Sequence, residues 1–187
     1  MKINRTVLFT FLALIIVAAL YRILPGRPFG FAPQIAMALF AGAVVKDKKY
    51  AFALPLFSMI LSDVLYEILF KAGLSIMPGF YEGQITNYIL FTLLTFGGFL
   101  IKKINFLQVF LASIAAPTVY FLLSNFLVWI SASGGYQRPK TFNGLMMCMS
   151  DGIPFYKNSL YGTLFFSAVL FGGYYLLKQY FLKPKTV

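Results

Sequence analysis

Residues 50–70 read YAFALPLFSMILSDVLYEILF, an apolar segment long enough to cross a membrane that nevertheless contains Asp63 and Glu67. A carboxylate in the hydrocarbon interior costs roughly 2.5 kcal/mol or more, so it normally faces protein, water or a ligand. The two residues are four positions apart, which puts them on one face of a helix. The segment therefore predicts a membrane helix with a polar face inside the protein.

The composition of the whole chain agrees with a membrane location. Of its 187 residues, 60% are hydrophobic and 11% are charged, and the mean hydropathy is +0.80. A soluble domain of this length cannot hide so much apolar surface. The formal net charge of +11 does not indicate nucleic-acid binding, because the basic residues gather at the ends of apolar segments, where they set topology. One cysteine and no histidine exclude a disulfide framework and a Ser-His-Asp triad, and we expect neither a metal site nor a cofactor.

The apolar segments predict an all-α protein that forms one integral membrane domain over residues 1–187. Six transmembrane helices are expected, at about 6–23, 29–45, 50–70, 85–101, 106–130 and 159–181. The second is short and rich in Ala and Gly, and Ala38 and Gly42 have the small-xxx-small spacing that allows close helix contact. It crosses the membrane only if the residues from Phe29 contribute; a broken or re-entrant segment is the alternative.

The distribution of positive charge predicts the topology. Ten of the 16 Lys and Arg residues fall on one side of the expected spans and six on the other. The side with more positive charge is normally cytoplasmic, so we expect both termini in the cytoplasm. The connections at 22–30, 71–84 and 131–158 then face outwards.

The polar residues within the spans indicate where a ligand would bind. Asp63 lies about 20 Å and Glu67 about 26 Å along the third helix from its cytoplasmic end, so both belong to the outer half. They predict a ligand or cation site open to the outside, or an internal salt bridge to Arg22 or Arg27. For Glu67 a further alternative is a place at the membrane interface, where it would anchor a loop. Asn125 lies at a similar depth in the fifth helix and needs a hydrogen-bond partner, either Asp63 or another helix.

The longest outer connection, residues 131–158, is expected to be a functional lid. Loops of this length are usually functional lids or binding loops, or else disordered, and the aromatic residues of this one favour a packed lid. The candidate ligand contacts are Asp63 and Asn125 from the helices and Tyr136, Arg138 and Asn143 from this connection. Arg138 and Lys140 would hold an anionic group of the ligand or, alternatively, lipid phosphate.

Several stretches together resemble a known group of proteins. They are Phe31-Ala32-Pro33, Pro55-Leu56, Ser62-Asp63, Ser124-Asn125-Phe126 with Trp129, and Thr141 to Asn158 with its Ile153-Pro154-Phe155-Tyr156-Lys157-Asn158 end. The chain resembles an uncharacterised family of bacterial membrane proteins, mostly from Bacteroidetes. That family is itself similar to the substrate-binding (S) components of energy-coupling factor transporters. The resemblance implies a six-helix S-component-like bundle in the bacterial inner membrane. This bundle would bind a vitamin-like or other micronutrient solute near its outer face. The first helix departs from S components, because it lacks their Ala-xxx-Ala motif for docking a transmembrane partner.

These observations favour binding and uptake of a small solute over catalysis, and we expect the protein not to be an enzyme. The expected partners are the lipid bilayer, a small molecule and membrane partner subunits, with no nucleic acid. The alternative is a non-catalytic accessory or structural subunit of a larger cell-envelope complex, in which the polar groups hold helices together. A cation-coupled carrier that uses Asp63 and Glu67 is a third possibility.

Overall fold

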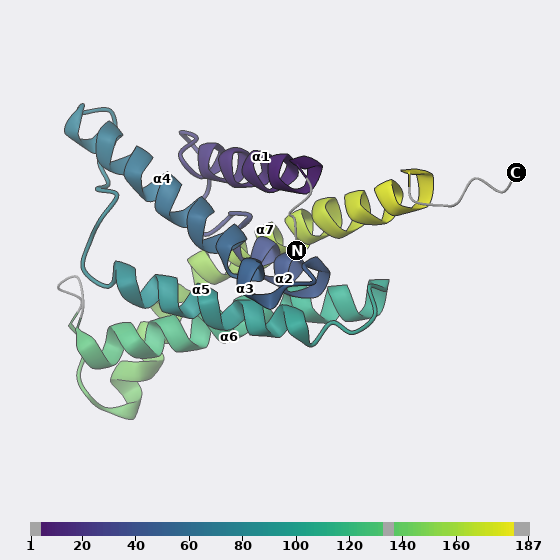
Figure 1. Ribbon diagram of the computed structural model, residues 1–187. Coiled ribbons are helices and arrows are strands. Elements are labelled where there is room, and N and C mark those ends of the chain that lie inside the picture. Colours follow the sequence, from purple (N-terminus) through teal and green to yellow (C-terminus); the bar gives the residue numbers. More distant parts are fainter. Residues whose placement is uncertain (1–4, 133–136, 182–187) are drawn as a thin grey trace, which may run out of the picture.

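The computed structural model describes residues 5–132 and 137–181, and all regular structure in these ranges is helical (Figure 1). The helices are α1 (Arg5–Arg22), α2 (Gln34–Val44), α3 (Lys48–Ala51), α4 (Ala53–Lys71), α5 (Gln84–Phe99), α6 (Phe106–Ser131) and α7 (Phe142–Phe181). The single turn α3 is separated from α4 by Phe52 alone, so the two form one helical segment. The prediction of an all-α protein is confirmed for the described residues.

Within the described ranges, three helical segments are long and apolar enough to cross a membrane: Lys48–Lys71, Phe106–Ser131 and Phe142–Gln179. Two shorter apolar helices cover Phe9–Arg22 and Gln34–Val44. Large apolar side chains lie on the outside of the long helices, for example Phe57 of α4, Leu122 of α6 and Phe165 of α7. Apolar helices with apolar outer surfaces indicate a protein that is embedded in a lipid bilayer.

The last helix differs most from the prediction. We expected a connection up to Asn158, but α7 already begins at Phe142, so most of the predicted lid is helical. Thr141 provides a start signal, since its Oγ1 accepts a hydrogen bond of 3.2 Å from the backbone N–H of Gly144. Gly and Pro are poor helix formers, yet the helix continues through Gly152 and Pro154. Packing along α6, the main neighbour of α7, holds this stretch in helical form.

The short helix α2 lies in the middle of the bundle (Figure 1), where it packs against α4, α5, α6 and α7. Eight of its eleven residues are buried and none is exposed, so it is surrounded by protein rather than lipid. The predicted close contact at its small residues is confirmed. A Cβ built on Gly42 would lie 2.8 Å from the Cα of Gly98 in α5, which leaves no room for a side chain at the crossing.

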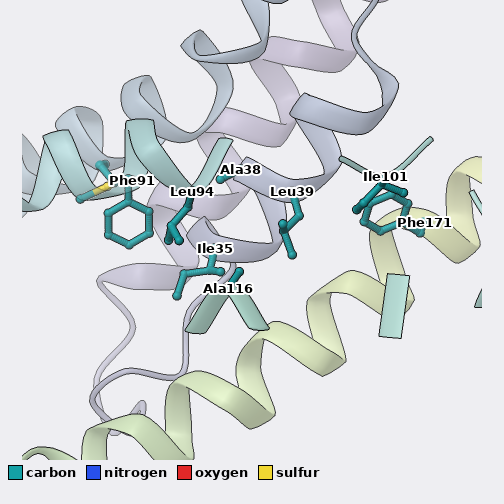
Figure 2. Close-up of a cluster of buried hydrophobic side chains, with 9 residues drawn as sticks. Ile35, Ala38, Leu39, Phe91, Leu94, Ile101, Ala116 and Phe171 are labelled. Carbon is teal, nitrogen blue, oxygen red and sulfur yellow. The ribbon is translucent and has the colours of Figure 1, made fainter. Parts of the chain in front are cut away.

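Beside this crossing lies a hydrophobic cluster built around α2 (Figure 2). Ile35, Ala38 and Leu39 of α2 pack with residues from four other helices and the α5–α6 connection: Met59, Phe91, Leu94, Ile101, Ala116 and Phe171. Because α2 is held on several sides, its first turn has a defined position relative to α5 and α6. Ile35 and Phe91 belong both to this cluster and to the lining of the cavity described next.

Candidate functional site

Asp63 is the centre of a buried polar network that joins α1, α4 and α5. Its side chain is almost completely buried. One carboxylate oxygen forms an ion pair with Nη1 of Arg22. The other accepts hydrogen bonds from Nε2 of Gln84 and, at 2.7 Å, from the hydroxyl of Tyr88. The carboxylate is therefore fully used within the protein, and the salt bridge to Arg22, one of the two partners named from the sequence, is present.

Arg22 and Arg27 shape the connection that follows α1. The carbonyl oxygen of Arg22 accepts hydrogen bonds from the hydroxyl of Tyr66 at 2.7 Å and from Nε of Arg27 at 3.1 Å. Nη1 of Arg27 also donates to the carbonyl of Phe31 at 2.8 Å. Among the described residues, no carboxylate lies within ion-pair distance of Arg27. Arg27 thus holds the backbone of this connection in place through neutral carbonyl acceptors.

Glu67 is part of a different contact from Asp63. Its carboxylate lies 3.3 Å from Nζ of Lys71 on the same helix and accepts a 3.1 Å hydrogen bond from the backbone N–H of Gly79. A Cβ on Gly79 would lie well inside contact distance of the Asp63 carbonyl, so the loop after α4 runs directly over that helix. Glu67 therefore holds this loop in place.

A cavity of about 460 Å³ lies next to Arg22. It is lined by the last residue of α1, the connection to α2, the first turn of α2, Met59 of α4, Tyr81 of the loop before α5, the first half of α5, the second half of α6 and part of α7. It lies at the opposite end of α2 from the basic turn at residues 46–49. Its polar lining residues are Arg22, Arg27, Gln34, Tyr81, Asn87, Tyr120, Ser124, Asn125, Tyr156 and Ser159. The volume is in the usual range for small-molecule sites, which are roughly 300–1,000 Å³.

Gln34 is the most unusual of these lining residues. It is 2% exposed, and neither its Nε2 nor its Oε1 has a hydrogen-bond partner within the described protein. A buried amide without partners costs about 1–3 kcal/mol, so such groups are rare and call for an explanation. Since Gln34 lines the cavity, a molecule in the cavity would supply the missing partners.

Asn125 lies on the α6 side of the cavity. Its Nδ2 donates to the carbonyl of Phe121 in its own helix at 2.8 Å. A Cβ on Gly152 of α7 would lie 2.4 Å from its Oδ1, so the two helices approach each other closely at this point. The hydrogen bond of its Nδ2 therefore lies within α6 and not with Asp63 or another helix, the two predicted partners, and its contact with α7 at Gly152 is one of packing.

Phenol and amide groups extend the polar lining. The hydroxyl of Tyr120 donates to Oδ1 of Asn87 at 3.0 Å, and Nδ2 of Asn87 donates to the hydroxyl of Tyr81 at 2.7 Å. Tyr81 lies in the loop before α5, where burial raises the pKa of its hydroxyl above the ordinary value, so the phenol stays neutral at physiological pH. Neutral hydroxyls and amides bind a solute by hydrogen bonds. No cluster of three His, Cys, Asp or Glu residues suitable for a metal occurs in the described part of the chain.

The structure separates the predicted site residues. Asn125 lines the cavity. Asp63 does not line it, but forms an ion pair with Arg22, which does. Arg138 does not line the cavity and forms a 2.7 Å ion pair with Asp151. Asn143 is exposed in the first turn of α7 and also lies outside the lining. Tyr136 falls outside the described residues.

Sequence reasoning missed Gln34 and Asn87. A signal existed for Gln34, because it is the only polar residue in the otherwise apolar α2 and directly follows Pro33. A glutamine at a helix start is ordinary, however, unless the helix is known to be surrounded by protein. Asn87 carried no comparable signal.

Comparison with known proteins gives one finding. No curated protein and no solved structure matches the chain. A family of unknown function, DUF6580, matches residues 2–185, which is nearly the whole length. The chain therefore belongs to the DUF6580 family.

Proposed function

We propose that this protein binds a small solute in the 460 Å³ cavity and takes part in its uptake across the bacterial inner membrane. Gln34 carries the proposal. A buried carboxamide with no partner destabilises the empty protein, and it is accounted for if a bound molecule completes its hydrogen bonds. The surrounding hydroxyls, amides and aromatic rings form the mixed lining that is typical of small-molecule sites.

The proposed topology places this cavity at the outer side. In this topology the chain crosses the membrane six times in an S-component-like bundle, and both termini lie in the cytoplasm. The positive-inside rule assigns the basic turn at 46–49 to the cytoplasm, and the cavity lies at the other end of α2. A site open to the outside suits capture of a solute before its transfer inwards. Transfer itself would involve the whole protein, alone or with membrane partner subunits.

The first experiment is mass spectrometry of small molecules extracted from purified protein. We expect a molecule that co-purifies with the wild type and is lost from Gln34→Leu. Ser167→Ala is the matched control, because the Ser167 hydroxyl is also buried and without a partner but does not line the cavity. This variant should retain the molecule.

Two results would contradict solute binding. One is that no small molecule accompanies the wild type while a protein partner co-purifies at constant stoichiometry, which would favour an accessory subunit of a larger complex. The other is that Gln34→Leu and Ser167→Ala retain the molecule equally, which would place its site elsewhere.

A further inference from the structure

The cavity contains a positive charge that no negative charge in its wall balances. Arg22 and Arg27 line it, and its described lining includes no Asp or Glu. Asp63 neutralises Arg22 from behind the wall. Arg27 donates to the backbone carbonyls of Arg22, Pro28 and Phe31, which are neutral acceptors. The described lining therefore has one uncompensated guanidinium group.

The start of α2 adds to the positive potential. The first N–H groups of a helix have no acceptor within the helix and carry a partial positive charge. Pro33, the residue before α2, gives no side-chain cap, and the first two helical residues, Gln34 and Ile35, line the cavity. The unpartnered Nε2 of Gln34 is a further donor at the same place. Such a helix start is a favourable position for an anionic group.

The rest of the wall is largely apolar and aromatic. Aromatic side chains come from the connection before α2 and from α5, α6 and α7: Phe29, Phe91, Tyr120, Phe121, Phe155 and Tyr156. Rings of this kind pack well against an aromatic or other planar apolar body. The cavity thus combines a cationic end with an aromatic chamber.

We propose, on the basis of the proposed function, that the solute is a small organic anion with a planar apolar body. Its anionic group binds between Arg27 and the first turn of α2, and the body lies among the aromatic rings. Nε2 of Gln34 donates to the solute, and Oε1 of Gln34 accepts from a hydroxyl or N–H of the same molecule. Arg27 selects the charge of the solute, whereas Arg22 is committed to Asp63.

The charge of the cavity is measurable without knowing the natural solute. Ser124→Cys places a thiol in the lining, and Cys148→Ala removes the buried native thiol. The thiol is treated with the anionic reagent 2-sulfonatoethyl methanethiosulfonate and with the cationic 2-trimethylammonioethyl methanethiosulfonate. Each rate is divided by the rate of that reagent with free cysteine. Val128→Cys provides a second reporter in the same cavity.

We expect the normalised rate to favour the anionic reagent by about tenfold, the effect of one nearby charge that is partly screened. Arg27→Gln should bring the ratio close to one. Arg138→Gln is the matched control, because it removes an arginine outside the lining and should leave the ratio unchanged. A ratio near one, or in favour of the cation, in protein that retains Arg27 would overturn the inference while solute binding stands. If neither reagent reaches either introduced thiol in folded protein, the cavity is closed and both proposals fail.

A second measurement tests the anion itself. Benzoate and benzamide have the same planar body and differ in charge, and each is tested for protection of the Ser124→Cys thiol against neutral methyl methanethiosulfonate. Benzoate should protect at several-fold lower concentration than benzamide, and Arg27→Gln should abolish the difference. Equal protection, stronger protection by benzamide, or no protection by either in an accessible cavity would overturn the anionic class.

Discussion

Asp63→Asn replaces one side-chain atom, and the structure predicts that it lowers the stability of the protein strongly. One carboxylate oxygen accepts from Arg22, and the other accepts from Gln84 and Tyr88. An amide in the same position must turn its NH₂ group towards a donor, whichever way it is oriented. The substitution also leaves the charge of Arg22 without its counter-ion.

The expected cost follows from the burial of the pair. Removing one partner of a buried ion pair costs about 3–5 kcal/mol. The side chain of Arg22 is 18% exposed and that of Asp63 is 2% exposed, so water screens the pair only slightly. Because Arg22 keeps this limited access to water, we expect the lower end, a loss of about 3 kcal/mol in the free energy of unfolding.

Asp151→Asn is the matched control. Asp151 and Arg138 form an ion pair of 2.7 Å, but their side chains are 45% and 34% exposed. Exposed pairs contribute at most about 1 kcal/mol, so this variant should lose far less stability. Unfolding in mixed detergent micelles with increasing dodecyl sulfate, followed by far-ultraviolet circular dichroism, measures both variants.

A double-mutant cycle with Arg22→Gln isolates the pair. The two single changes should be non-additive by roughly 2 kcal/mol, because each removes the same interaction. Equal costs for Asp63→Asn and Asp151→Asn, or simple additivity in the cycle, would refute the reasoning. Asp63 would then not be a structural anchor, and direct solute contact would have to be reconsidered.

Three further predictions address the cavity, the packing and the topology. Gln34→Leu should raise the free energy of unfolding of solute-free protein by about 1 kcal/mol, since it removes two unpaired buried groups, and it should abolish solute binding. A destabilised variant that still binds the solute would contradict this. Gly98→Ala should lower the free energy of unfolding by about 1–3 kcal/mol, because its Cβ would lie 2.4 Å from the carbonyl oxygen of Leu39. In the same assay Gly173→Ala should be neutral or stabilising, because a Cβ there has no neighbour within 4 Å. In intact cells of a Cys148→Ala background, a membrane-impermeant maleimide should label Leu24→Cys but not Lys49→Cys; the opposite pattern would reverse the proposed topology.

The sequence alone was sufficient for properties that depend on neighbouring residues. Hydropathy located the helices, because an apolar run of this length satisfies its backbone only as a helix in lipid. The cost of a carboxylate in hydrocarbon indicated that Asp63 faces the interior of the protein, and Arg22 was one of two ion-pair partners proposed for it. The boundary at Phe142 was missed because the packing of α7 on α6, which keeps the stretch with Gly152 and Pro154 helical, comes from distant parts of the chain.

What only the tertiary structure decided is which polar groups meet and which remain unpaired. Gln84 and Tyr88 complete the network around Asp63 from a helix that the sequence did not connect to it. Gln34 differs from an ordinary glutamine at a helix start only because four helices surround α2 and leave a cavity beside it. Hydrogen bonds and cavities depend on distances between residues far apart in the chain, and hydropathy and charge pattern do not contain those distances. The sequence therefore determined that a membrane helix of this protein contains buried polar residues. The fold determined that the cavity is lined by Gln34 and Arg27 rather than by Asp63.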